Sequence, residues 1–351
     1  MQLDYLIVGQ GLAGTVLAHH LEQRGYSFVI VNPPQSKAAS RVAAGIFNPL
    51  TGLRLSKSWM ADTLFPVLHR FYPALEKKLG QKFFHQRDIY RPYRSFQEQN
   101  EWFSKTAQAT YQPYIGSISQ ENIYDAWIHS PFQGLQSTQS GYVDLPLFLD
   151  SSQNYFRQRG VYREAFVKPE NLQTEENRVF WQDIEARFVV FCEGTAAATN
   201  PLFKDLPFSI VKGELLEINI PDCPLPVMVN QSVSLLPTQA GTFKVASTYQ
   251  WQQYDWECSA AAQEELVEKV QRFLKVPFTI SRQLAGLRPA TQSKRPLMGR
   301  HPDYPRLVLF NGLGSKGVSL APYWAERLLG SLEADEALPE EIDIQSVFRL
   351  S

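Results

Sequence analysis

A glycine-rich turn near the start of the chain constrains the fold more than any other feature. Residues 3–8 form a short apolar run, residues 9–14 read Gly-Gln-Gly-Leu-Ala-Gly, and apolar residues then recur at helical spacing over residues 15–23. Gly25 is suited to end that helix, and residues 27–31 form a second apolar run. This order of strand, glycine turn, helix and strand predicts a βαβ unit that binds a dinucleotide.

Each glycine of the turn has a distinct expected role. Gly9 permits the tight turn, Gly11 lets the backbone approach a pyrophosphate, and Gly14 lets the helix pack closely on the strand. The phosphates would then lie at the N-terminus of the helix, where the backbone N–H groups are free. The alternative is a structural glycine turn without a ligand.

The second strand of the unit ends at Asn32-Pro33. Dinucleotide-binding units usually carry an acidic residue there, which accepts hydrogen bonds from the ribose hydroxyls. Asn32 retains an acceptor in its side-chain carbonyl oxygen, so we expect it to take that role. The alternative is that Asn32 opens the turn before Pro33.

Length and composition restrict the class of protein. With 351 residues, the chain is long enough for two domains at about 150 residues each. Its 34 basic and 35 acidic residues give no excess positive charge for nucleic acid. No apolar run approaches the ~18 residues that span a membrane, and the N-terminus shows no secretory signal. We therefore expect a cytoplasmic protein without nucleic acid or membrane partners.

Cysteine and histidine usage gives no metal motif. The three cysteines, Cys192, Cys223 and Cys258, lie far apart, which is typical of a reducing compartment. The six histidines show no metal-ligand spacing, so we predict no metal site.

A second Gly-x-Gly-x-x-Gly pattern spans residues 312–317, between an apolar run at residues 307–310 and a predicted helix from Val318. No partner strand is evident after that helix, which disfavours a second dinucleotide site. We expect the loop to direct backbone N–H groups toward negative charge that develops on a reduced flavin. Lys316 is interpreted as a solvated lysine of this loop; the alternative is that it adds a full charge at the flavin.

Several further segments, in order along the chain, resemble one known family. They are Ser40-Arg41-Val42-Ala43-Ala44-Gly45-Ile46, Ser140-Gly141-Tyr142-Val143-Asp144-Leu145, a strand ending at Cys192-Glu193-Gly194, Lys212-Gly213-Glu214, Ala285-Gly286-Leu287-Arg288-Pro289-Ala290-Thr291, Arg295-Pro296-Leu297-Met298-Gly299-Arg300-His301-Pro302 and the loop at residues 312–322. Together with the N-terminal turn, they resemble the D-amino-acid-oxidase-like family of FAD-dependent oxidoreductases, most closely its glycine oxidase and sarcosine oxidase branch.

This resemblance implies noncovalently bound FAD, since the sarcosine oxidase branch attaches its flavin through a cysteine near the position of Leu287 and none is present there. It also implies a set of cofactor-binding residues that extends the glycine turn: Gly9, Gly11, Leu12, Ala13, Gly14, Asn32, Pro33, Ser40, Ala44, Gly45, Ile46, Val167, Gly194, Leu313, Gly314, Ser315, Lys316, Gly317, Val318 and Ser319.

Arg288 matches the arginine that binds the substrate carboxylate in the glycine oxidase branch. A guanidinium offers a rigid fork to a carboxylate, and the alternative is a structural ion pair. Two departures bear on the substrate: Ser234 stands where glycine oxidases place a tyrosine, and Ser315 where some relatives carry a second arginine. We expect Tyr249 to replace the tyrosine, so Arg288 and Tyr249 are the predicted catalytic pair.

The predicted fold is α/β, α+β overall, with a Rossmann-like FAD-binding domain interleaved with a mixed, largely antiparallel sheet that forms the substrate domain. The expected FAD-binding domain comprises residues 1–81, 140–206 and 285–351, and the substrate domain comprises residues 82–139 and 207–284. We expect a helix over residues 59–79, a hairpin around residues 239–241 and a helix near residues 260–274. Arg91 and Arg94 are interpreted as residues of a solvated turn; the alternative is contact with an anionic substrate.

These features predict a flavoprotein that oxidises the C–N bond of a small amino acid or secondary amine by hydride transfer to flavin N5, with oxygen or another electron acceptor. Three alternatives remain open: an FAD dehydrogenase that acts on a hydroxy acid or passes electrons to a protein, the oxidase module of a tRNA-modifying enzyme, and a non-catalytic flavin-binding protein. The chain does not indicate which substrate or oligomeric state applies.

Overall fold

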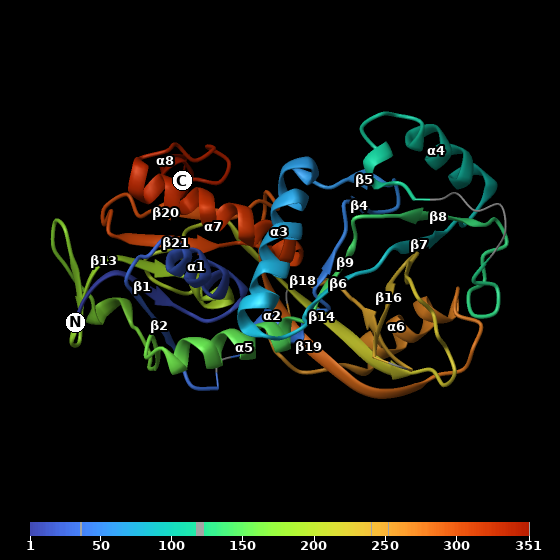
Figure 1. The fold of residues 1–351 in the computed structure, drawn as a ribbon, viewed down its shortest axis with the longest axis horizontal. Helices are drawn as coiled ribbons and strands as arrows, with labels where there is room; N and C mark the ends of the chain where they lie inside the picture. Colours follow the sequence, from blue (N-terminus) through green and yellow to red (C-terminus); the bar gives the residue numbers. More distant parts are fainter. Residues whose placement is uncertain (36, 117–122, 240, 252, 351) are drawn as a thin grey trace.

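Two large sheets lie toward opposite ends of an elongated molecule (Figure 1). The structure is a computed structural model that describes residues 1–35, 37–116, 123–239, 241–251 and 253–350.

The first sheet has a parallel centre. Its central strands follow the order β10 (Tyr162–Glu164), β2 (Phe28–Asn32), β1 (Gln2–Val8), β13 (Ile184–Phe191) and β21 (Leu307–Asn311). Antiparallel strands β11 (Gln173–Thr174), β12 (Val179–Trp181) and β20 (Leu297–Arg300) extend it. Parallel strands require crossovers, and α1 (Leu12–Gln23) supplies the one between β1 and β2.

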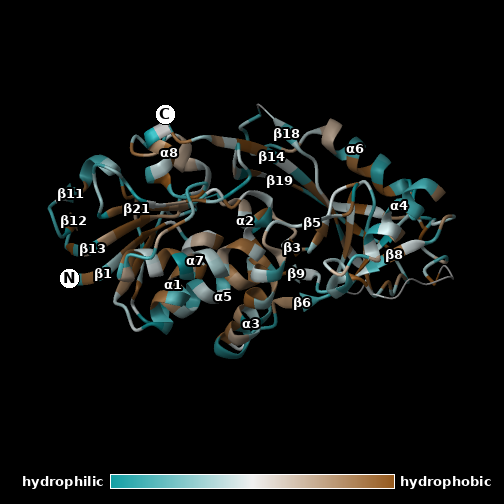
Figure 2. Cartoon of the chain, turned by 90° about the horizontal axis from the view of Figure 1, so that it is seen from above, coloured by the Kyte–Doolittle hydropathy of each residue, from teal (hydrophilic) through white to brown (hydrophobic). Residues whose placement is uncertain are grey.

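Helices cover both faces of this sheet, as its strands of consecutive apolar residues require. Tyr5 and Ile7 of β1 face a core that includes α1, α3 (Ala61–Leu79), α5 (Leu145–Gln158) and α7 (Gly317–Ala334). Leu6 and Val8 face the opposite core, which includes η3 (Gly194–Ala198) and α8 (Ile344–Leu350). Figure 2 shows α1, α5 and α7 on one side of the apolar strands and α8 on the other.

The second sheet is mixed and mostly antiparallel. Its order is β19 (Thr279–Thr291), β14 (Phe208–Asn219), β17 (Thr242–Ala246), β16 (Ser234–Gln239), β15 (Met228–Asn230), β7 (Ile89–Pro92) and β8 (Gly134–Ser137), and β18 (Gln250–Trp251) also pairs with β14. β15 and β7 run parallel. One face packs on α6 (Ala260–Gln271), through Leu266 and Val270.

The remaining elements are smaller. β3 (Ile46–Phe47), β9 (Gly141–Val143) and β6 (Phe84–Gln86) form a three-stranded sheet, and β4 (Leu50–Thr51) and β5 (Ser56–Lys57) form a hairpin. The others are α2 (Ala39–Val42), α4 (Phe96–Thr106), η1 (Gln112–Tyr114), η2 (Pro169–Asn171) and η4 (Gly314–Lys316).

The predicted fold class is confirmed, since an α/β sheet with a βαβ unit stands beside a mixed sheet. The helix expected at residues 59–79 begins at Ala61, because Met60 before it adopts a left-handed conformation with φ 51°. The helix expected near residues 260–274 ends at Gln271. The expected hairpin joins β16 to β17, and Ala240 in its turn lies outside the described residues. Among those residues, no strand follows α7, in agreement with the sequence argument against a second βαβ unit.

Candidate functional site

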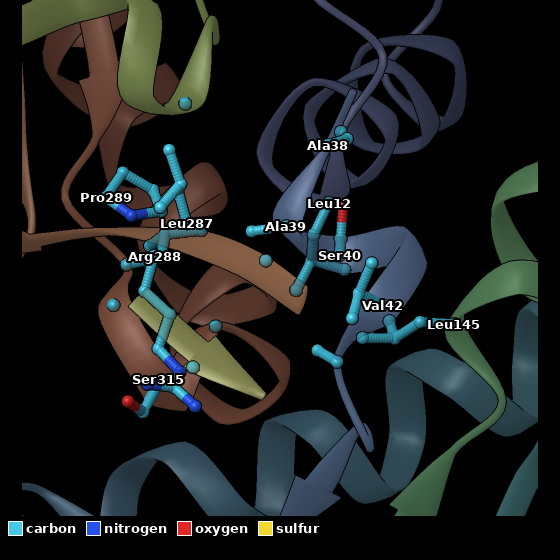
Figure 3. A pocket seen from close by; sticks show the side chains of 18 of the residues that line it. Leu12, Ala38, Ala39, Ser40, Val42, Leu145, Leu287, Arg288, Pro289 and Ser315 are labelled. Atoms are coloured by element: carbon cyan, nitrogen blue, oxygen red, sulfur yellow. The ribbon is translucent and has the colours of Figure 1, made fainter. Parts of the chain in front are cut away.

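A long cavity of about 740 Å³ runs from the glycine turn after β1 to the second sheet. Figure 3 shows Leu12, Ser40 and Val42 on one wall, facing Leu287, Arg288 and Pro289 on the other. Of the predicted cofactor and substrate residues, all except Gly14 line this cavity.

The glycine turn forms one end of the cavity, and its geometry fits a dinucleotide. Gly9 has φ 102°, which favours glycine, and a Cβ at Gly14 would overlap the carbonyl oxygen of Gly9. Gly14 therefore packs the helix on the turn from behind. A Cβ at Gly11 would instead meet only Ser40 Oγ, at 3.5 Å, so the space above Gly11 is open for a ligand. The amides at the N-terminus of α1 have no side-chain cap, which suits the binding of phosphate.

Asn32 organises the same turn. Its Oδ1 accepts a hydrogen bond from the backbone N–H of Gln10 at 2.9 Å, and its Nδ2 donates to the carbonyl of Pro33 at 3.1 Å. The ribose contact of Asn32 stays a prediction. Asn32 thus has a structural role in the turn that the sequence did not reveal.

The middle of the cavity is held by backbone packing. Gly45 has φ 72°, and a Cβ there would overlap the carbonyl oxygen of Val143 in β9. The amide of Val143 donates to the carbonyl of Gly45 at 3.0 Å. This close approach fixes the segment that carries Ala44 and Ile46 along the cavity. Val167 lines another part of the wall.

The loop before α7 reaches the cavity from the first sheet. Asn311 Nδ2 donates to the carbonyl of Gly194 at 2.8 Å, which ties this loop to the end of β13. Gly312 and Gly314 have φ 74° and 52°, so the loop needs glycine at both positions. Lys316 Nζ donates to Ser58 Oγ at 3.0 Å.

Lys316 is an exposed residue of the cavity wall whose ammonium group is partly desolvated. Burial lowers the pKa of its ammonium group, and the nearby charges of Arg295 and Lys294 lower it further. None of the ion pairs found among the described residues includes Lys316. A positive charge in this environment is stabilised by an anionic ligand.

Arg288 lies on β19 at the second sheet. Its side chain crosses Gly213 of β14 and donates from Nη2 to Ser247 Oγ at 2.6 Å and from Nη1 to the carbonyl of Thr248 at 3.2 Å. Burial lowers its pKa. None of its hydrogen bonds in the described part of the chain goes to a carboxylate.

Tyr249 packs against the guanidinium of Arg288. The ring centroid of Tyr249 lies 4.5 Å from Arg288 Cζ, and 57% of the tyrosine is exposed. The ring therefore covers Arg288 from the solvent side. A guanidinium stacked on an aromatic ring is held in a fixed orientation, which suits recognition of a planar carboxylate.

The interpretation of Arg91 as a residue of a solvated turn is wrong. Arg91 is 2% exposed and lines the cavity, because its guanidinium bonds carbonyl groups of the β4–β5 hairpin, about forty positions earlier in the chain. Arg94 differs, since it forms an ion pair with Glu98 and remains partly exposed.

Sequence reasoning also missed two glutamates of the cavity wall. Glu214 is buried and accepts hydrogen bonds from the backbone and hydroxyl of Ser259 and from Gln283. Burial raises the pKa of Glu193, which follows β13 and accepts from Asn200 Nδ2 at 2.8 Å. The position of Glu193 at the carboxyl end of a parallel strand was a usable signal, because ligands bind at that edge.

Other polar groups complete the wall, among them Asn48, Thr51, Asn230, Ser232, Ser234, Ser247 and Asn311. No group of His, Cys, Asp and Glu among the described residues is arranged to hold a metal ion. Within the same residues, none of the helices is both long and apolar enough to cross a membrane.

The parallel sheet, its glycine turn and the long cavity define a dinucleotide-binding protein with a second sheet over the far end of the ligand site. Comparison with known proteins makes the assignment specific. A family model described as FAD dependent oxidoreductase matches residues 4–329, and the chain belongs to this family, the DAO family. The family's cofactor is FAD, and the open space above Gly11 fits it.

Sequence relatives are distant. The chain is 27% identical over 168 residues to a glycine oxidase of Bacillus subtilis (strain 168), a match that covers 46% of this chain and 44% of the relative. A glycine oxidase of Bacillus licheniformis gives 27% identity over 164 residues, covering 45% and 44%. The match thus spans less than half the length of these curated relatives.

The fold is shared more widely. A glycine oxidase structure from Geobacillus kaustophilus superposes with a TM-score of 0.78 at 18% identity, over 96% of both chains. An iminodiacetate oxidase from Chelativorans sp. BNC1 gives a TM-score of 0.76 at 20% identity, over 96% of this chain and 98% of the other. At these identities the similarity establishes the fold.

Proposed function

We propose that the protein oxidises the C–N bond of a small amino acid or secondary amine that carries a carboxylate. The observation that carries this proposal is Arg288, a half-buried arginine on the cavity wall whose hydrogen bonds go to a hydroxyl and a carbonyl. An arginine without a carboxylate partner in such a site favours an anionic ligand.

Bound FAD supplies the hydride acceptor at its N5 atom. The chain's own residues bind and orient the substrate. Arg288 holds the carboxylate, and Tyr249 fixes the guanidinium plane and shields the amine from solvent. The amides and the ammonium of the loop that carries Ser315 and Lys316 would face the bound cofactor and would favour negative charge on it.

We propose that FAD is held without a covalent bond. Cys192 lines the cavity, but its carbonyl packs against Gly9, in the glycine turn, rather than beside Leu287. Contacts to the cofactor would come from the predicted residues that line the cavity, with Gly14 acting indirectly by packing α1 on the turn.

We also propose the division into an FAD-binding domain of residues 1–81, 140–206 and 285–351 and a substrate domain of residues 82–139 and 207–284. The strands of the parallel sheet all fall within the first set, and β7, β8 and β14 to β18 within the second, which supports the division. β19 runs through the boundary at residue 285 and carries Arg288 on the substrate sheet.

An anaerobic absorbance screen tests the proposed function. The purified FAD-loaded protein is mixed with amino acids, N-alkyl amino acids and hydroxy acids, and flavin reduction is followed. We expect an amino acid to reduce the flavin of the wild-type protein. In Arg288→Met, we expect the Kd for that amino acid to be about 100-fold weaker while the FAD content is unchanged. Reduction by hydroxy acids alone, or no reduction by any amine, contradicts the proposal. Peroxide release in air then distinguishes oxygen from another electron acceptor.

A further inference from the structure

Arg91 is a second arginine of the cavity wall, more deeply buried than Arg288, and the proposed function does not use it. It lies on β7, whose residues alternate between the two faces of the sheet. Tyr90 faces the core under α6. Ile89, on the same face as Arg91, packs beside Ala44 and Ile46, which line the cavity. The strand register therefore turns Arg91 toward the ligand site.

The hydrogen bonds of Arg91 leave most of its donors unused. Nη2 donates to the carbonyl of Leu50 at 2.7 Å and Nη1 to the carbonyl of Gly52 at 3.3 Å. Nε is buried and has no partner among the described groups. Because a guanidinium carries five N–H donors, the two carbonyls satisfy only part of it.

The charge of Arg91 is only partly compensated, because Glu98 acts on it from a distance and none of the ion pairs found among the described residues includes Arg91. The nearby carboxylate of Glu98 is taken by Arg94, which donates to it from Nε at 3.0 Å and from Nη2 at 2.6 Å. The ring centroid of Trp102 lies 5.8 Å from Arg91 Cζ, and this aromatic contact does not neutralise the charge. A buried cation without a direct ion-pair partner is costly, so an entering anion would be favoured.

The surroundings of Arg91 suit a polar ligand. Asn48, Thr51 and Gly52 of the neighbouring hairpin and Asn230 of β15 line the same cavity. The position is remote from Arg288. Strands β14, β17, β16 and β15 lie between β19 and β7, so at about 4.8 Å per strand the two backbones are about 24 Å apart along the sheet. The Arg288 side chain shortens this separation by reaching across β14 to Ser247.

From these observations we propose that Arg91 forms a second anion subsite, and that the protein's substrate carries a second anionic group, carboxylate or phosphate, several bonds from the carboxylate held by Arg288. This inference rests on the proposed function, because Arg288 fixes the first end of the substrate. It narrows the substrate class to elongated amino acids or amines with two anionic ends.

The test measures binding of inert ligands to the oxidised FAD-loaded protein by perturbation of the flavin spectrum, at constant ionic strength. Straight-chain dicarboxylates from malonate to azelate are compared with monocarboxylates of equal length, and an ω-phosphonocarboxylate distinguishes phosphate from carboxylate. We expect longer dianionic ligands to bind about 10-fold or more tightly than the matched monoanions.

Variants assign that preference to Arg91. Arg91→Met is expected to abolish it and Arg91→Lys to retain part of it, whereas Arg87→Met, an exposed arginine in the same segment, leaves it unchanged. The inference is overturned if the wild-type protein binds no dianionic ligand more tightly than the matched monoanion, whatever the chain length. It is also overturned if Arg91→Met keeps the full preference for dianions. If Arg91→Met fails to fold, the comparison of Arg91→Lys with the wild-type ligand series tests the inference.

The same titrations separate the two proposals. If monocarboxylates bind and Arg288→Met weakens them, but dianions gain nothing, the proposed function stands and the Arg91 subsite is wrong. If no carboxylate perturbs the flavin spectrum and no amine reduces the flavin, the proposed function is wrong, and the Arg91 subsite that rests on it falls with it.

Discussion

The guanidinium of Arg288 occupies the space in which residue 213 would place a Cβ atom. Gly213 and Arg288 lie on adjacent antiparallel strands, β14 and β19, and the three atoms nearest to a Cβ built on Gly213 are Cζ, Nη1 and Nη2 of Arg288. Glycine at this position is therefore a condition for the extended arginine side chain that reaches Ser247 and Thr248.

Gly213→Ala should weaken carboxylate binding without any change to Arg288 itself. The added methyl group displaces the guanidinium, and loss of its charge-assisted hydrogen bonds to ligand is expected to raise the Kd for carboxylates about 10- to 100-fold. Flavin perturbation titrations measure this effect. Adding Gly213→Ala to Arg288→Met should then cost little further binding, because both changes act through one group. Additive losses in the double variant would contradict this.

Tyr249 should act through its ring rather than its hydroxyl. Tyr249→Phe keeps the contact with Arg288 and is expected to leave carboxylate affinity nearly unchanged. Tyr249→Ala removes a contact of about 0.5–1 kcal/mol, which corresponds to roughly a 2- to 5-fold weaker Kd. If Tyr249→Phe loses as much affinity as Tyr249→Ala, the hydroxyl binds the ligand directly and the assigned role is wrong.

Two glycines of the N-terminal turn should fail in different ways when replaced by alanine. Gly11→Ala has room in the protein, with Ser40 Oγ at 3.5 Å, but fills the space above the turn. We expect a folded apoprotein of normal stability that retains little FAD. Gly14→Ala overlaps the Gly9 carbonyl and is expected to destabilise the apoprotein by about 2 kcal/mol or more. Denaturation of both apoproteins and their FAD content check the distinction, and normal FAD retention in Gly11→Ala would contradict it.

Lys316 should raise the reduction potential of the bound flavin, because a partly desolvated ammonium favours the more negative reduced state. Lys316→Met is expected to lower the potential by about 30 mV, which corresponds to about 1.4 kcal/mol for two electrons. Anaerobic titration with a reference dye measures this. Lys77→Met provides the matched control, since Lys77 is exposed, does not line the cavity, and its charge is screened by solvent. Equal shifts in both variants would rule out a local effect of Lys316.

Features set by local sequence were predictable. The turn from Gly9 to Gly14 combines conformational and packing constraints within six residues, and those constraints are readable without knowledge of the rest of the chain. The late loop at residues 312–317 was recognisable for the same reason. The two segments meet in one cavity, where a Cβ at Gly317 would lie 2.9 Å from Leu12 Cδ2, and only the resemblance to a known family indicated that meeting.

Features set by long-range contacts were not predictable. Arg91 lies in the polar pattern Tyr-Arg-Pro-Tyr-Arg, which resembles an exposed turn, and its burial results from the hairpin carbonyls of Leu50 and Gly52. The role of Gly213 likewise exists only because β14 pairs with β19. In each case the partner lies about forty or more positions away, and neither residue carries a periodic signal of it.

Stability should fall in mild acid because of His20. This histidine stacks on Phe71 with ring centroids 4.9 Å apart, and burial lowers its pKa to about 4. The unfolded chain, with an ordinary histidine pKa of about 6.5, therefore binds more protons than the folded protein between pH 6.5 and 4. The contribution of His20 to the free energy of unfolding is present above pH 6.5 and is lost as the pH falls toward 4, up to about 3 kcal/mol.

Denaturation midpoints measured at several pH values with saturating FAD should show a shallower acid dependence in His20→Leu than in the wild type. His129→Gln serves as the control, because His129 is exposed and should leave the dependence unchanged. An identical slope in His20→Leu and wild type would assign the acid lability to other groups, the fully buried His19 foremost, whose pKa burial also lowers.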